Sequence, residues 1–276
     1  MPIIVRSTHE GFADAVRWHL QPFRLSGPNP WGASNADVFV SEEDKDTDPP
    51  AYSFNYLGER AGRSRSLPDL LHHFLWKINS VIPKSSDDYL FLHAGAVARD
   101  GEGVLLPARM DSGKSSLTLA MLQNGFEYLS DEFGALDPVT RRAYPVEKRI
   151  SLEQRALRRF PELEGKIEDP MIERADLSPE LWSRYVRPED VDAGVSRPVP
   201  VRWVVFPMPD WEGPPRLEEM SSTAAVQEMV QNSFNVERYD GRGVILLSLI
   251  GREVRSFRLL GGTPAQRAAL LAERLV

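Results

Sequence analysis

Short apolar runs alternate with longer amphipathic segments along this chain, and that alternation is typical of an α/β protein. Residues 104–106 are apolar throughout and 201–206 are mostly β-branched and aromatic, so both runs predict buried strands. Residues 67–82 repeat apolar side chains at helical spacing, which predicts a helix with one core-facing side. Residues 264–276 follow a threonine and open on a proline, so they predict a C-terminal helix.

The same two periodicities predict the remaining elements. Further strands are expected over 37–40, 52–56, 126–130, 133–136, 142–146 and 255–260, and further helices over 9–20, 117–122, 152–159, 178–186 and 223–234. Residues 242–249 are compatible with a helix or a strand, and the helix is preferred. Clusters of proline, glycine and charged residues predict loops over 41–50, 58–66, 161–176, 188–200 and 207–215. We therefore expect an N-terminal α+β subdomain with a small sheet over residues 1–85 and a larger core over 86–276.

A phosphate-binding loop is predicted between the strand at 104–106 and the helix at 117–122. Residues 108–115 read Ala-Arg-Met-Asp-Ser-Gly-Lys-Ser, which matches the Walker A motif except that Ala108 replaces its first glycine. In that context successive backbone N–H groups and the start of a helix attract phosphate. The cofactor-binding residues predicted here are Asp111, Ser112, Gly113, Lys114, Ser115 and Ser116.

The chemistry of this loop predicts two cofactors. Lys114 is expected to reach the β- and γ-phosphates of ATP or another nucleoside triphosphate, because a P-loop lysine does so. The Ser115 hydroxyl is expected to be a ligand of Mg²⁺, which prefers oxygen donors.

An acidic pair, Asp131 and Glu132, follows the strand predicted over 126–130. The carboxyl end of a strand is where ligands bind in open α/β sheets. A carboxylate there can hold Mg²⁺ or take a proton from an attacking hydroxyl. We predict that Asp131 holds the metal together with Ser115 and that one of the two carboxylates is the base. A solvated acidic turn is the alternative.

His93 lies in an apolar run, where a lone histidine is more often a core residue with satisfied hydrogen bonds than a functional one. However, Asp100 and Gly101 predict a hairpin turn between this run and residues 104–106. Such a hairpin would bring His93 towards the phosphate loop.

Together, residues 89–137 resemble the catalytic core of bacterial HPr kinase/phosphorylase, and more closely the HPr-kinase-like proteins of peptide-modification pathways such as lasso-peptide tailoring. The resemblance is carried by His-Ala-Gly-Ala-Val at 93–97, Gly-Lys-Ser-Ser at 113–116 and Tyr-Leu-Ser-Asp-Glu at 128–132. It implies a P-loop-containing, HPr-kinase/PEP-carboxykinase-like core and phosphorylation of a serine hydroxyl on a peptide or protein. The Ile-Arg-Gly signature tied to the reverse phosphorylase reaction is not found in place.

The family's functional residues fall on His93, Lys114, Ser115, Asp131 and Glu132 in this sequence. In the family the acidic pair, usually two aspartates, binds metal and acts as the base on the acceptor serine. Because the second member here is Glu132, the division of roles within the pair stays open. His93 is expected to orient the acidic pair or the γ-phosphate.

Two basic segments have open roles. Lys148 and Arg149 precede Ile-Ser-Leu and are either a surface pair or contacts for phosphate. Arg60, Arg63 and Arg65 belong to the predicted loop 58–66, which is either solvated or binds an acidic peptide or phosphate.

Composition excludes several classes of protein. A net charge of −7 gives no basis for general nucleic-acid or anionic-membrane binding. The absence of cysteine excludes disulfides, thiolate metal sites and cysteine nucleophiles. The N-terminus lacks a signal-peptide pattern and no apolar run is long enough to span a bilayer, so a cytoplasmic location is expected.

The expected function is therefore a Mg²⁺- and nucleotide-dependent serine kinase acting on a peptide or protein. Because the family includes hexamers, a homo-oligomer is among the expected assemblies. Two alternatives stay open. One is a small-molecule kinase on the same loop, and the other is a nucleotide-binding regulator without transfer activity, which the departures at Ala108 and Glu132 favour.

Overall fold

A computed structural model of the chain describes residues 3–24, 37–44, 46, 50–110, 112–167 and 182–275. Over these residues the chain is mixed α/β, as predicted. It divides into two compact units, each described by itself. The first comprises Met1–Ser86, Glu153–Arg155 and Glu168–Arg184, so far as these are described, and the second comprises Asp87–Leu152, Ala156–Ile167 and Tyr185–Val276. The first unit thus takes in short segments from beyond residue 86.

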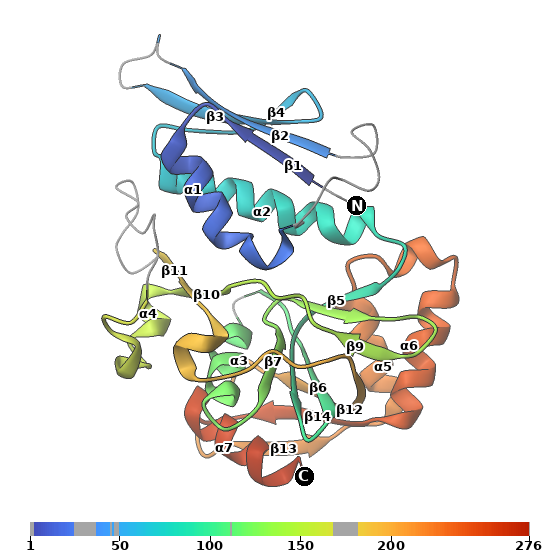
Figure 1. Ribbon diagram of the computed structural model, residues 1–276. Coiled ribbons are helices and arrows are strands. Elements are labelled where there is room, and N and C mark those ends of the chain that lie inside the picture. The colour runs from blue at the N-terminus through green and yellow to red at the C-terminus, as the bar shows by residue number, and fades with distance from the viewer. Residues whose placement is uncertain are drawn as a thin grey trace. The chain divides into compact units, whose positions relative to one another are not determined.

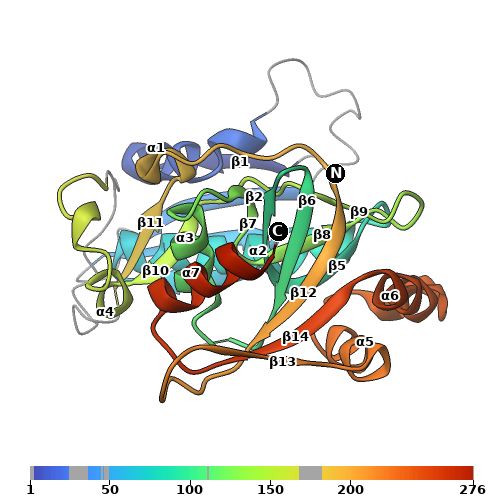
Figure 2. The same cartoon turned by 90° about the horizontal axis from the view of Figure 1, so that it is seen from below.

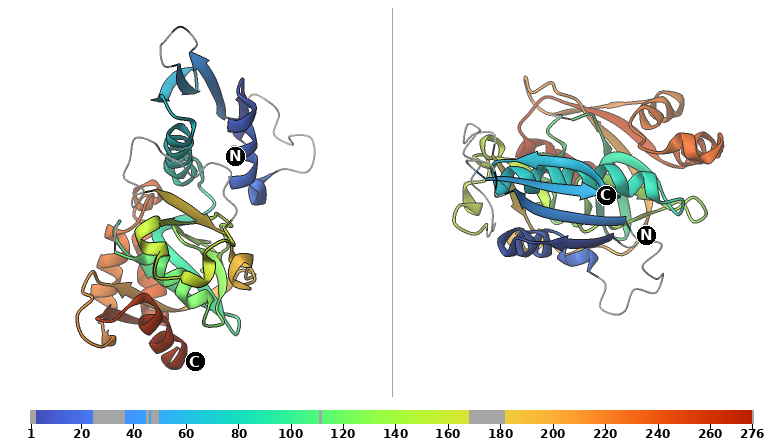
Figure 3. Two further views of the ribbon diagram at one scale, coloured as in Figure 1. Left: turned by 90° about the vertical axis from the view of Figure 1, so that its left-hand side faces the viewer. Right: turned by 90° about the horizontal axis from the view of Figure 1, so that it is seen from above.

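The first unit is a four-stranded sheet with two helices on one face (Figures 1 and 3). The strands lie in the order β1 (Ile3–Ser7), β2 (Asp37–Asp44), β3 (Ala51–Tyr56) and β4 (Glu59–Ser64), and the helices are α1 (Glu10–His19) and α2 (Leu67–Ser85). Pairing is parallel between β1 and β2 and antiparallel elsewhere. Phe74 of α2 packs edge-on against Phe12 of α1 and Phe54 of β3, with ring centroids 5.7 and 5.6 Å apart, so the three rings join helices and sheet.

The predicted loop over 58–66 is wrong, because most of it is strand β4. Leu57 and Gly58 have φ values of 51° and 84° and form a two-residue turn, with Tyr56 paired to Glu59 across it. Since β4 is an edge strand that buries none of its side chains, it carries no alternating apolar signal. Strand β2 likewise runs through Asp44, into the segment 41–50 predicted as a loop.

The second unit is built on an eight-stranded sheet (Figure 1). Its order is β13 (Arg216–Glu219), β14 (Arg255–Leu260), β12 (Val199–Pro207), β6 (Glu102–Pro107), β5 (Leu90–Arg99), β8 (Phe133–Leu136) and β9 (Arg142–Tyr144), with β7 (Glu127–Ser130) also paired to β5. Strand β9 also pairs with the start of β12. Strands β12, β6, β5, β8 and β9 therefore form a closed ring of strand pairings.

Two pairs of helices cover opposite faces of this sheet (Figure 2). Helix α3 (Lys114–Leu122) packs with α7 (Pro264–Arg274), and α5 (Ser222–Gln231) packs with α6 (Arg242–Glu253). The hydrophobic core on the side of α3 and α7 contains Leu119, Phe257 and Leu271. The core on the side of α5 and α6 contains Met229 and Leu247. The central strands are buried on both sides, which agrees with their continuous apolar sequence.

Strand β5 organises the site-bearing part of the sheet. It pairs antiparallel with β6 over 94–99, with β7 over 96–98 and with β8 over 90–93. The turn between β5 and β6 is the predicted hairpin, with φ values of 53° at Asp100 and 79° at Gly101. One strand therefore sets the register of the three segments that carry the predicted site.

The region after β9 departs most from prediction. Strands β10 (Ile150–Glu153) and β11 (Ser183–Val186) form a two-stranded sheet, and helix α4 is only Gln154–Leu157. The helix predicted over 152–159 is thus shorter, and that over 178–186 is wrong at 183–186, where pairing with β10 satisfies the backbone. Residues 161–163 form a 3₁₀ turn, while 168–176 and 178–181, parts of the predicted loop and helix, lie outside the described residues.

Strands β1 and β13 were not predicted, and the other expected strands and helices are present with small shifts at their ends. Within the described ranges, no helix has both the length and the apolar composition needed to cross a bilayer.

Candidate active site

The predicted phosphate loop joins β6 to α3 in the second unit. Gly113 precedes the helix with φ of 79°, and its carbonyl accepts the first helical hydrogen bond from Leu117 N at 2.9 Å. The N-cap residue is Gly113, which has no side chain to cap the helix. The hydroxyl of Ser112 is buried and has no hydrogen-bond partner in the part of the chain that the structure describes. A buried hydroxyl of this kind beside the amides at the start of a helix is suited to an anion. Asp111 lies outside the described residues, and Ser116 is buried in the first turn.

His93 contacts this loop through both its backbone and its side chain. Its carbonyl accepts a hydrogen bond from Ala108 N at 3.2 Å. Its Nε2 lies 3.1 Å from Lys114 Nζ. Since an ammonium can only donate, Nε2 is the acceptor and the ring proton is on Nδ1. Burial, followed by the charge of Lys114, lowers the pKa of His93 to about 4, so the imidazole is neutral at pH 7.

Asp131 lies in the two-residue gap between β7 and β8 and is 2% exposed. It accepts hydrogen bonds from Ser115 Oγ at 3.3 Å and from Ser151 N at 3.1 Å. Burial raises the pKa of Asp131, although the charge of Lys148 opposes that shift. The carboxylate and the Ser115 hydroxyl thus form a small oxygen-rich pair next to the loop.

Glu132 points to a different partner. It forms an ion pair with Lys148 Nζ, which lies 5.8 Å from the centroid of the Phe133 ring. Burial favours the neutral carboxyl, but the charge and hydrogen bond of Lys148 together with smaller effects of His93 and Lys114 lower the pKa of Glu132. Its side chain is 26% exposed, so Glu132 is the more accessible member of the pair.

The two basic residues that precede β10 have different surroundings. Lys148 belongs to the site through Glu132. Arg149 is buried, and its pKa is lowered first by burial and then by the charge of Arg187. Arg60, Arg63 and Arg65 belong to the first unit.

Tyr128 and the Ser151 N–H are site groups that the sequence did not reveal. The Tyr128 hydroxyl accepts a hydrogen bond from Asp131 N at 3.1 Å and lies 2.6 Å from the Lys148 carbonyl oxygen. It therefore connects the two segments that carry Asp131 and Lys148. Tyr128 occupies a buried position of β7, three residues before Asp131. That spacing was the one feature of the sequence that could have pointed to its role in the site.

The described residues contain no group of three or more His, Cys, Asp or Glu side chains arranged to hold a metal. Magnesium commonly binds through one or two carboxylates, with water and substrate phosphates as further ligands, and Asp131 with Ser115 fits that pattern. No protein-family model and no curated protein sequence matches this chain.

Proposed function

We propose that this protein is a kinase that transfers the γ-phosphoryl group of ATP or another nucleoside triphosphate to a hydroxyl group. The observation that carries the proposal is the convergence of Lys114, His93, Ser115 and Asp131 within hydrogen-bonding distance at one loop. These groups come from β5, the start of α3 and the gap after β7. Phosphoryl transfer depends mainly on positioning and charge stabilisation, and this arrangement is suited to both.

The loop residues bind and orient the phosphates. The amides at the start of α3, the Ser112 hydroxyl and the Lys114 ammonium are donors suited to contact them. Neutral His93 accepts from Lys114 and so fixes the direction of the ammonium without adding a positive charge. Ser115 and Asp131 would hold Mg²⁺, which supplies charge neutralisation between the β- and γ-phosphates when bound.

Glu132 is the proposed base. Asp131 is nearly inaccessible and is engaged by Ser115 and Ser151, whereas Glu132 is partly exposed and ionised. As the acceptor oxygen bonds to the γ-phosphorus, the bond from phosphorus to the β,γ-bridging oxygen breaks. The hydroxyl proton passes to the Glu132 carboxylate and a nucleoside diphosphate leaves.

For the acceptor we propose a serine of a peptide or protein, on the resemblance of residues 89–137 to HPr-kinase-like proteins. The test is incubation of the full chain with γ-labelled ATP, Mg²⁺ and either a library of serine-containing peptides or a panel of small alcohols, read by mass spectrometry. Peptides with alanine in place of serine are the matched control. Label on serine peptides alone supports the proposal. Label on small alcohols alone makes the protein a small-molecule kinase, and nucleotide binding without any labelled product makes it a regulator.

A further inference from the structure

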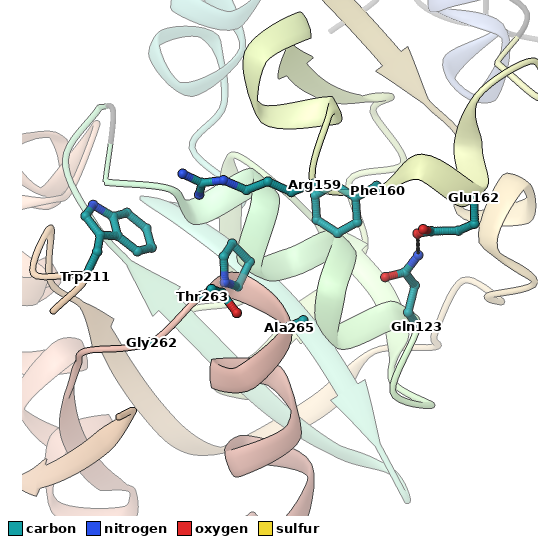
Figure 4. A pocket seen from close by; sticks show the side chains of 9 residues that line it. Gln123, Arg159, Phe160, Glu162, Trp211, Gly262, Thr263 and Ala265 are labelled. Atoms are coloured by element: carbon teal, nitrogen blue, oxygen red, sulfur yellow. Dashed lines mark hydrogen bonds between the residues drawn. The ribbon is translucent and has the colours of Figure 1, made fainter. Parts of the chain in front are cut away.

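A cavity of about 620 Å³ lies beside α3 in the same unit as the phosphate loop (Figure 4). Its lining comes from four separate segments: Gln123; Arg159, Phe160 and Glu162; Trp211; and Gly262 to Ala265. Trp211 stands at one end, and a hydrogen bond from the Gln123 amide to the Glu162 carboxylate marks the other (Figure 4). Its volume is in the range of pockets that bind small ligands and cofactors.

Trp211 is a wall shared by this cavity and the phosphate loop. A Cβ atom built on Gly113 would lie only 2.4 Å from Trp211 Cη2, so the indole edge touches the last residue of the loop. One side chain therefore lines the cavity and contacts the residue that precedes α3. From Gly113 to Gln123, α3 rises roughly 15 Å at about 1.5 Å per residue. A phosphate chain in the loop thus leaves room for a further group alongside the helix.

Arg267 holds that wall in place. Its guanidinium carbon lies 4.1 Å from the Trp211 ring centroid. Its Nε donates to the Gly261 carbonyl at 2.6 Å, and its Nη2 donates to the Met208 carbonyl at 3.1 Å and to the Asp210 carbonyl. A nearly buried arginine thus fixes both the indole and the backbone next to it, which preorganises the pocket.

The chemistry of the lining matches a nucleoside. An indole face and the Arg159 guanidinium, 5.7 Å from the indole centroid, offer stacking for a flat heteroaromatic ring. Phe160 and Pro264 add apolar surface. The exposed Glu162 carboxylate and Gln123 amide can exchange hydrogen bonds with the N–H and C=O or ring-nitrogen groups on the edge of a base.

We propose that this cavity binds the base and ribose of the nucleoside triphosphate whose phosphates occupy the loop at Gly113 to Ser116. The inference rests on the proposed function and adds the recognition site for the nucleoside. The base stacks against Trp211 and Arg159, with its hydrogen-bonding edge turned towards Gln123 and Glu162.

Calorimetric titration with ATP and with inorganic tripolyphosphate tests the inference, because tripolyphosphate has the phosphates but no nucleoside. The unaltered protein should bind ATP at least tenfold more tightly than tripolyphosphate. Trp211→Ala should weaken ATP binding about tenfold or more beyond any change in tripolyphosphate binding, since base–aromatic stacking is worth about 1–3 kcal/mol. Trp76→Ala, which removes an exposed tryptophan from the first unit, is the control.

Ala265→Trp provides a second test that leaves the loop contact intact. Ala265 is exposed at the cavity surface, so the larger side chain should fill the space and weaken ATP binding by tenfold or more. Val139→Trp, which adds the same side chain at an exposed turn of this unit outside the cavity, should bind as the unaltered protein does. Equal affinity for ATP and tripolyphosphate, or equal weakening of both by Ala265→Trp, overturns the nucleoside site and leaves the phosphate loop standing. Binding of neither ligand by the unaltered protein overturns the proposed function itself.

Discussion

The two ends of α3 differ in what surrounds them. At its start Lys114 and Ser116 are buried, and the lysine lies against a histidine from another strand. Near its end Gln123 and Glu162 are exposed around an open cavity. Buried charges interact strongly because water does not screen them, whereas exposed polar groups exchange partners at little cost. The comparison suggests that chemistry requires the buried end, while recognition can use the exposed one.

Removal of Lys114 tests the buried end most directly. Lys114→Ala should lower kcat/KM for transfer by roughly 10³-fold or more, because the phosphates lose their positioned cation. The measurement is labelled phosphate transfer, with Lys166→Ala, an exposed lysine of the same unit, as control. A circular dichroism melt should show that the variant is folded. A folded Lys114→Ala protein that transfers phosphate normally would rule out this mechanism.

The second largest effect is expected at the proposed Mg²⁺ ligands, Asp131 and Ser115. Asp131→Asn keeps the shape of the side chain but removes the charge that would balance Mg²⁺, so transfer should fall on the order of 10²-fold. Its activity should also require more Mg²⁺, which a titration of rate against metal concentration measures. Asp100→Asn, at the exposed turn between β5 and β6, should leave both quantities unchanged. An unchanged metal requirement in Asp131→Asn would remove Asp131 from the metal site.

A double-mutant cycle measures how strongly the phosphate loop and the Trp211 side of the cavity are coupled. Gly113→Ala should cost about 1–2 kcal/mol from the left-handed backbone and about 1–3 kcal/mol from the contact with Trp211. In the Trp211→Ala background only the backbone cost should remain. Urea unfolding of the four proteins gives the coupling energy. If the two changes are additive, Trp211 does not constrain the loop.

The smallest expected effect concerns pH. Lys148 lowers the pKa of Glu132, so Lys148→Met should raise that pKa and move the acid limb of the kcat/KM profile to higher pH. Stability gives an independent readout. A depressed carboxyl pKa stabilises the fold above the unfolded pKa, and this contribution is lost as pH falls through the folded pKa. Lys148→Met should therefore flatten the fall in stability on the acid side, and Lys148→Arg should preserve it. An unmoved acid limb would exclude Glu132 as the base.

Most of the site at the buried start of α3 could be predicted from short sequence patterns. The strand–loop–helix order placed Lys114 and Ser115, and the turn at Asp100 and Gly101 placed His93 on the adjacent strand. The role of Lys148 stayed open because it depends on a non-local contact, in which Val146 N donates to the Leu129 carbonyl at 2.8 Å. Sequence periodicity does not report such contacts.

The cavity near the exposed end of α3 could not be predicted, because it too depends on contacts between segments distant in sequence. The cavity lining comes from four segments that are far apart in sequence, and none of them carries a motif. Strand β4 was missed because an edge strand with charged side chains lacks alternation. Residues 183–186 were assigned to a helix because local propensity does not include the pairing with β10.

The shared register of β5 has a consequence for heat inactivation. His93, the phosphate loop and the acidic pair hold their separations only while β5 remains paired with β6, β7 and β8. No partly melted form that frees this strand can keep the three together. Loss of catalysis on heating should therefore coincide with cooperative melting of the central sheet, with no active intermediate before it.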